Sequence, residues 1–203
     1  RYGAFASIAS NRTGGDTNGA NDVFLHDRLE ATTIPVTAAI GATHPSISAD
    51  GRFIAVRSRA SLPPSGSNTA HIYIYDMLTG IATPVSIASS GDAGYQDSGP
   101  PSISANGQTV AFASVSSNLA PDDTNGLSDV FFHERPLFTV SGKITSLADG
   151  QGMAGVGVTA GSYSAITGPG GEYHLTGLPS GTYTLLPVEA GLSFEPASHT
   201  VDL

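Results

Sequence analysis

Bulky apolar side chains occupy both sets of alternating positions in three similar segments: DVFLHD at 22–27, HIYIYD at 71–76 and DVFFHE at 129–134. Successive side chains of an extended strand point to opposite faces of a sheet. One face of each segment therefore carries Val, Ile, Leu or Phe, and the other carries Phe or Tyr followed by His or Tyr. We expect three β-strands in sheets that are covered on both sides, because apolar surface is unfavourable in water.

The three segments belong to an internal repeat. HPSISADGRFIAVRS at 44–58 matches PPSISANGQTVAFAS, which lies 56 residues further on, and RYGAFASIASN at 1–11 matches QTVAFASVSSN at 108–118. Each repeat predicts four strands: PSIS, FIAVRS or TVAFAS after an Asp-Gly or Asn-Gly turn, the bulky strand, and a proline-containing edge strand such as ATTIPVT or ATPVSI. Such a period is typical of propeller blades. The predicted blades are 1–41, 42–97 and 98–136.

Two of the three blades are incomplete. The first begins at its second strand, and in the third the bulky strand runs directly into HERPLFTVSG with no edge strand. Three such blades do not close a ring, since propellers have about four or more blades. Either the chain is a fragment of a longer protein, or copies of the chain supply one another's missing strands.

After Pro136 the repeat ends and alternating strands separated by glycine-rich turns follow. This pattern predicts a second domain, a small β-sandwich, over residues 137–203. We expect TGPGGEYHLTGLPSGTYTL to form its central hairpin and FEPASHTV its closing strand. The predicted fold class is all-β, with three partial or complete four-stranded propeller-type blades plus the sandwich.

Both regions resemble known families. PSISADGRFIAV and PSISANGQTVAF, followed by IYIYDMLTG or DVFFHER, resemble the TolB-type, WD40-like propeller repeat over about 1–136. FTVSGKI, GMAGVGV and TGPGGEYHLTGLPSGTYTL resemble the carboxypeptidase regulatory-like domain, a prealbumin-like β-sandwich, over about 138–203. This second resemblance implies a non-catalytic spacer or accessory module of a secreted or surface protein.

Composition narrows the range of partners. The formal net charge is -9, and Lys143 is the only lysine. Nucleic acid is therefore not an expected partner. We expect no membrane span, because no apolar run approaches the roughly 20 residues that a span requires. The absence of cysteine excludes disulfides, thiolate catalysis and cysteine-bound zinc.

The repeated phrase Asp-Thr-Asn-Gly precedes the bulky strand of the first and third blades. Its oxygen-bearing residues have the same spacing in both copies, and the candidate calcium ligands are Asp16, Asn18 and Asp22 with Asp123, Asn125 and Asp129. Short oxygen ligands at alternating positions suit a hard cation such as calcium. The alternative is a simple turn in which the Asn-Gly pairs reverse the chain. The middle blade has PPSGSNTAH there, so the blade itself does not require the motif.

No motif in the sequence predicts a catalytic group. His26 and His133 align with Tyr75, a position that selects a ring with a polar tip, and packing is the expected role of the six histidines. The chain has no Gly-x-Ser-x-Gly elbow, and the glycines of TGPGGEY are not followed by the lysine of a phosphate-binding loop.

The expected function is that of a non-enzymatic extracellular or cell-surface structural or interaction protein. Bacterial surface proteins often lack cysteine, so we expect a secreted bacterial protein. Its expected partners are other copies of itself, in an oligomer or a fibre, or other surface proteins and glycans. An open sheet edge favours strand addition between copies. Two alternatives stay open: an accessory region of a larger secreted hydrolase, and a glycan-binding module.

Overall fold

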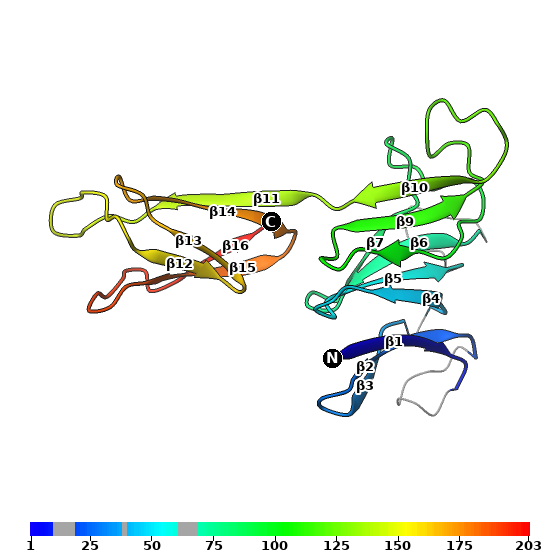
Figure 1. The fold of residues 1–203 in the computed structure, drawn as a ribbon, viewed down its shortest axis with the longest axis horizontal. Coiled ribbons are helices and arrows are strands. Elements are labelled where there is room, and N and C mark those ends of the chain that lie inside the picture. The colour runs from blue at the N-terminus through cyan, green and yellow to red at the C-terminus, as the bar shows by residue number, and fades with distance from the viewer. Residues whose placement is uncertain (10–18, 38–39, 61–68) are drawn as a thin grey trace. The chain divides into compact units, whose positions relative to one another are not determined.

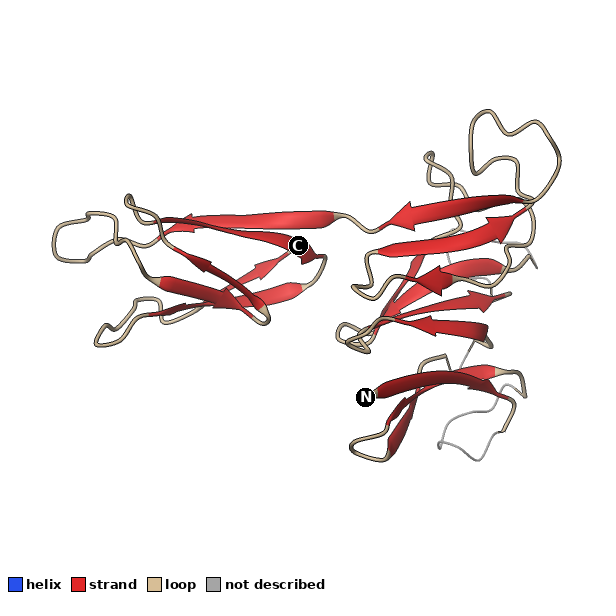
Figure 2. Cartoon of the chain, in the orientation of Figure 1, coloured by secondary structure: helices blue, strands red, loops and turns tan. Residues whose placement is uncertain are grey.

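The computed structural model describes residues 1–9, 19–37, 40–60 and 69–203, and every regular element in them is a β-strand (Figures 1 and 2). The all-β prediction is confirmed. No helix in these ranges is long and apolar enough to cross a membrane. The chain divides into two compact units, Arg1–Glu134 and Arg135–Leu203.

The first unit contains three antiparallel sheets, which we call blades 1, 2 and 3 (Figure 1). Blade 1 has the order β1 (Tyr2–Ser7), β2 (Asp22–Asp27), β3 (Thr32–Pro35). Blade 2 has the order β4 (Thr43–Ile47), β5 (Phe53–Ser58), β6 (His71–Asp76), β7 (Ile81–Pro84). Blade 3 comprises β8 (Ser102–Ile103), β9 (Thr109–Ser114) and β10 (Asp129–Glu134). The described strands therefore reproduce the predicted order in each repeat, with shorter outer strands.

The predicted Asp-Gly and Asn-Gly turns also set how neighbouring blades meet. Gly51 has φ +78° and Gly107 has φ +71°, which glycine adopts without the penalty of a side chain. A Cβ on Gly51 would lie 2.3 Å from the ring of Tyr2, and one on Gly107 would lie 2.3 Å from the ring of Phe53. An aromatic ring from the preceding blade thus packs against each turn.

Two separate apolar cores lie between the blades. Val23 and Leu25 of blade 1 pack with Ile54, Val56 and Tyr73 of blade 2. The opposite face of blade 2 packs against blade 3, and its members include Ala55, Ile72, Ile74, Val110 and Phe112. Blade 2 is therefore covered on both faces, as the two-sided apolar pattern of its strands predicts.

An ion-pair cluster around Asp97 fastens the loop before blade 3 to blade 2. Its carboxylate accepts a hydrogen bond from the backbone N–H of Ala70 at 2.8 Å and contacts Arg57 Nη2 at 3.1 Å and Arg59 Nη2. The Ala70 N–H is the largest cause of a lowered Asp97 pKa, and the two arginines add to it. Arg57 also donates to the carbonyl of Ser98 at 2.6 Å, so the cluster joins both segments.

We expect Asp97→Asn to lower the stability of the first unit near neutral pH, and the loss to fade in acid. The folded pKa of Asp97 lies below its ordinary 3.8, so the carboxylate adds stability above that pH and loses it as the pH falls through the folded value. The side chain is 40% exposed, so the expected loss is only about 1 kcal/mol. Urea unfolding at pH 7 and at about pH 2.5 measures it. Asp122→Asn, at an exposed position, is the control. An equal loss of stability at both pH values would contradict the expectation.

The second unit consists of two sheets. One pairs β11 (Leu137–Lys143) with β14 (Glu172–Pro179). The other has the order β13 (Tyr163–Ile166), β12 (Gly157–Ala160), β15 (Thr182–Val188), β16 (His199–Asp202). The predicted central hairpin is wrong, because β14 and β15 follow one another in sequence but belong to different sheets.

The core of the second unit explains that division. The alternating residues Tyr173 and Leu175 of β14 and Tyr183 and Leu185 of β15 are all buried in one cluster with Val140. Had β14 and β15 paired, their apolar sides would have shared one sheet face. Placed in opposite sheets, they pack on each other and close the core from both sides.

Candidate functional site

Blade 3 has an open apolar face. On β10, Val130 is 78% exposed and Phe132 is 72% exposed, and they pair with Ala113 and Ala111 of β9. We call these four residues the open face. The equivalent β6 residues of blade 2, Ile72 and Ile74, are 0% and 2% exposed because blade 3 covers them. The expectation that the bulky strand is covered on both sides therefore fails for β10.

The open edge of blade 3 results from its turn chemistry. In blades 1 and 2 the chain reverses after β2 and β6, with a positive φ at Ala31 (52°) and Gly80 (72°), and forms an outer strand. In blade 3 the dipeptide Arg135-Pro136 occupies this place, and the chain continues into β11 of the other unit. Hence β10 is an edge strand, paired with β9.

Blade 3 also differs from blades 1 and 2 at two adjoining residues, one of which packs against the following blade in both. Arg1 pairs with Asp27, with Nη2–Oδ2 at 2.6 Å, and Arg52 pairs with Asp76 at 2.8 Å. The aligned residue of blade 3 is Gln108, and the adjoining aromatic of blades 1 and 2 is replaced by Thr109. We did not predict these ion pairs from the sequence, although an alignment of the repeats places Arg1 with Arg52 and Asp27 with Asp76. The open face thus lacks the projecting ring that seats on a following blade.

The structure describes part of the predicted calcium motif. Asp16 and Asn18 lie outside the described residues. Asp22 is fully buried at the start of β2, and its Oδ1 accepts a hydrogen bond from the Thr37 hydroxyl at 3.4 Å. Asp123, Asn125 and Asp129 lie in and after the loop between β9 and β10. The described part of the chain contains no group of three or more His, Asp or Glu side chains that could hold a metal ion.

The loop of blade 3 does make the predicted turn. The Leu127 N–H donates to Asn125 Oδ1 at 2.6 Å, and Gly126 has φ +65°. Asn125 Nδ2 donates to the two carboxylate oxygens of Asp129 at 3.4 and 3.2 Å. The turn interpretation therefore accounts for Asn125 and Gly126, through hydrogen bonds that the asparagine makes. It leaves the role of Asp123 unexplained.

His71 is buried between two hydroxyl groups. Its Nε2 lies 2.7 Å from Thr69 Oγ1, and its Nδ1 lies 3.3 Å from Ser86 Oγ. Burial lowers the pKa of this imidazole, and the nearby Asp97 opposes the shift. His26 Nδ1 similarly lies 2.9 Å from Thr33 Oγ1. These contacts hold each ring in the blade by hydrogen bonding, in keeping with the packing role expected for the histidines.

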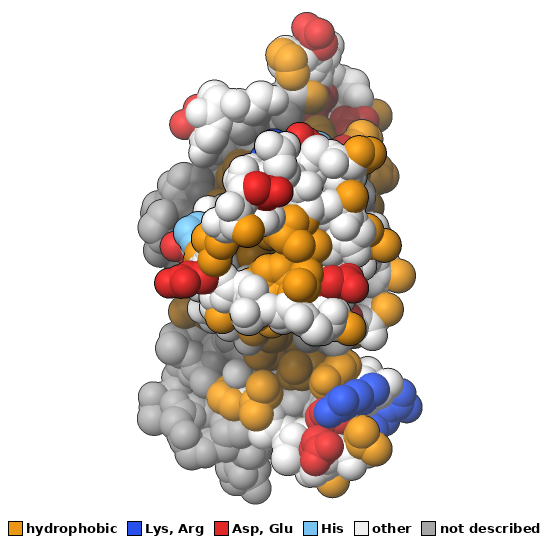
Figure 3. All heavy atoms as spheres, turned by 90° about the vertical axis from the view of Figure 1, so that its left-hand side faces the viewer, with side chains coloured by type: hydrophobic (Ala, Val, Ile, Leu, Met, Phe, Trp, Pro, Cys, Tyr) orange, Lys and Arg blue, Asp and Glu red, His pale blue; other side chains and the backbone are white. Residues whose placement is uncertain are grey.

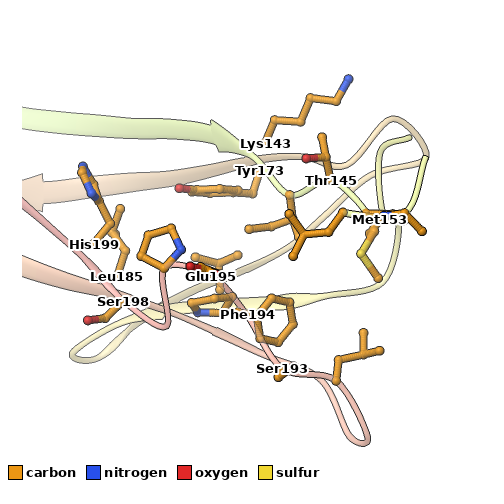
Figure 4. Close-up of a pocket in the computed structure, with 18 residues that line it drawn as sticks. Lys143, Thr145, Met153, Tyr173, Leu185, Ser193, Phe194, Glu195, Ser198 and His199 are labelled. Atoms are coloured by element: carbon orange, nitrogen blue, oxygen red, sulfur yellow. Dashed lines mark hydrogen bonds between the residues drawn. The ribbon is translucent and has the colours of Figure 1, made fainter. Parts of the chain in front are cut away.

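A pocket of about 550 Å³ opens in the second unit, and the sequence did not indicate it. Its walls come from β11, β14, β15 and the segment before β16, and the rings of Tyr173 and Phe194 border it (Figure 4). Glu195, Ser198 and His199 add polar groups (Figure 4). Figure 3 faces the left-hand side of Figure 1 and shows apolar side chains gathered on that face, with carboxylates around them. The pocket thus combines aromatic rings with hydrogen-bonding side chains.

No protein-family model and no curated protein matches the chain. Solved structures match it distantly. TolB from Acinetobacter baumannii is similar over 88% of this chain and 40% of its own, with 16% identity and a TM-score of 0.39. An acylaminoacyl peptidase in complex with Z-Gly-Gly-Phe-chloromethyl ketone covers 89% of this chain and 28% of its own, with 14% identity and a TM-score of 0.34. The Pyrococcus horikoshii acylaminoacyl peptidase gives 13% identity, 81% and 30% coverage and a TM-score of 0.32. The chain spans less than half the length of these proteins.

Proposed function

We propose that the protein is a non-enzymatic structural or interaction protein of the cell surface or extracellular space, and that its copies associate through blade 3. The observation that carries the proposal is the exposure of Val130 and Phe132 on a strand whose outer edge pairs with no other strand in the described part of the chain. Exposed apolar surface next to an open strand edge marks a contact surface for another chain. The second unit, by its resemblance to the regulatory-like domain, would serve as a spacer.

The charge distribution favours a second copy of the chain as the partner. The chain carries a net charge of -9, whereas Ala111, Ala113, Val130 and Phe132 are all uncharged. Two copies can therefore meet at these four residues without bringing like charges into contact, although Glu134, the last residue of β10, lies on the same side of the strand. A two-fold contact covers both open faces at once, and this is the commonest symmetry of soluble oligomers. Because Thr109 replaces the projecting ring, the contact differs from the stacking between blades 1 and 2.

Light scattering of the purified chain between about 1 and 100 µM tests the proposal, since specific dimers of modest interfaces form in this range. We expect the mass to rise from one copy to two. A mass of one copy over the whole range would reject self-association. A mass that keeps rising would reject the two-fold contact and indicate a head-to-tail contact that joins blade 3 to a different surface of the next copy.

The pocket of the second unit supports a glycan as a second candidate ligand. Aromatic rings that border a pocket, with carboxylate and hydroxyl groups beside them, suit the apolar faces and hydroxyl groups of a sugar. We expect maltohexaose, cellohexaose or xylohexaose to bind in calorimetry, and Phe194→Ala to weaken binding at least about 10-fold. Phe194→Tyr, which keeps the ring, is the matched control. If none of the three sugars binds, or if both variants bind like the unchanged protein, the pocket is not a glycan site.

A further inference from the structure

The carboxylate of Asp123 is buried without a partner. Both of its oxygens are shielded from solvent, and neither has a hydrogen-bond partner among the described residues. All residues from Thr124 to Ser128 and the preceding Asp122 are exposed. The two carboxylate oxygens are therefore enclosed even though Asp123 belongs to the largely exposed loop between β9 and β10, which extends from the sheet in Figure 1. We propose that this loop binds a calcium ion, with Asp123 as its principal ligand.

A buried carboxylate needs a compensating partner. Removing an ionised group from water without a partner is strongly unfavourable, and a bound cation removes this cost. None of the ion pairs formed by the described arginines, or by Lys143, includes Asp123. A carboxylate whose oxygens are buried with no positive partner among the described residues is the arrangement that a cation would complete.

Asp129 is the second carboxylate that the site would use. It lies six positions after Asp123, at the first residue of β10, and it is half-buried. Its contacts with Asn125 Nδ2, at 3.2 and 3.4 Å, are long for a hydrogen bond to a charged group, which is ordinarily about 2.7–2.9 Å. Asp129 therefore has weak hydrogen bonds to exchange for a metal bond.

The donor set favours calcium over other cations. Two carboxylates with main-chain carbonyls and water give a flexible, all-oxygen set, which calcium accepts. Magnesium demands a more regular octahedron, and zinc prefers nitrogen and sulfur ligands. The described residues place no third carboxylate or histidine in such a cluster. We therefore expect a moderate dissociation constant, of about 10⁻⁵ to 10⁻³ M.

Calorimetric titration of the chelator-treated chain with CaCl2 tests the inference, with Asp123→Asn and Asp122→Asn as matched variants. We expect Asp123→Asn to lower the stoichiometry by one ion per chain, whatever the first blade binds. Asp122 is exposed and adjacent, so Asp122→Asn should leave the stoichiometry unchanged. Asp129→Asn should weaken the same site by at least about 10-fold.

Thermal melting supplies a second readout. In calcium at about 100 times the dissociation constant, the melting temperature of the unchanged chain should rise by about 5 °C or more, while that of Asp123→Asn should not. In chelator, Asp123→Asn should melt no lower than the unchanged chain, because it removes a buried charge; this also shows that the variant folds. Unchanged stoichiometry in Asp123→Asn, or an equal loss in Asp122→Asn, would overturn the site. The result is independent of the association of copies, which light scattering measures.

Discussion

Val130→Thr combined with Phe132→Lys is expected to convert the associating protein into a monomer while leaving its melting temperature nearly unchanged. Both side chains are exposed in the single chain, at 78% and 72%, so replacing them removes little packing within blade 3. Exposed substitutions of this kind usually change stability by less than about 0.5 kcal/mol. Threonine also keeps the branched shape that suits a strand.

The expected loss of affinity is large because a two-fold contact contains each residue twice. Burial of a Val or Phe side chain contributes about 1.5–3 kcal/mol, and two lysines brought together at the contact add repulsion. We therefore expect dimerisation to weaken at least about 1,000-fold. Ile166→Lys, on a strand of the second unit where the side chain is 73% exposed, is the control and should keep the dimer. A dimer that persists in the double variant would assign the contact to another surface.

Gly171→Ala is expected to destabilise the second unit by about 3 kcal/mol or more, whereas Gly155→Ala should cost about 1 kcal/mol. Both glycines have a similar left-handed backbone, with φ +83° and +82°, so the conformational penalty of alanine is alike at the two sites. They differ in their surroundings. A Cβ on Gly171 would lie 2.2 Å from the carbonyl oxygen of Ile144, and one on Gly155 would meet nothing within 4 Å.

The difference in stability between these two variants measures the cost of the close contact between the added Cβ and the backbone alone. The atom in the way at Gly171 belongs to the backbone, and Gly171 also accepts the Ile144 N–H at 2.9 Å, so relief requires the end of β11 to move. Calorimetric melting of the full chain would show the transition of the second unit falling by at least about 12 °C in Gly171→Ala. Equal shifts in the two variants would mean that the backbone conformation, and not the contact, sets the cost.

The repeat shows which features of the fold can be predicted from local sequence patterns. The strands of blades 1, 2 and 3 and their glycine turns follow from alternation and from the Asp-Gly and Asn-Gly pairs, because both signals act within a few residues. The predicted hairpin of the second unit failed for the same reason. Alternation in β14 and β15 shows that each strand has an apolar face, but it does not show whether the two faces lie in one sheet or oppose each other across a core.

The candidate sites show the same limit of local sequence patterns. The sequence picked out the Asp-Thr-Asn-Gly loop, yet only the structure separates Asn125, which makes the turn, from Asp123, whose oxygens are buried without a partner. The pocket beside Tyr173 was missed because its lining comes from segments far apart along the chain. No spacing within one segment could have indicated it.

By itself, the sequence determined the all-β class, the period of the blades and the strand order within them, since these depend on side-chain alternation and turn residues that are local. The tertiary structure alone decided which apolar faces are covered. Ile72 and Val130 occupy equivalent positions on equivalent strands, and their difference in exposure arises because blade 3 packs on the first while the described chain places nothing over the second. Burial is a property of what lies opposite a side chain, and no pattern within a strand contains it.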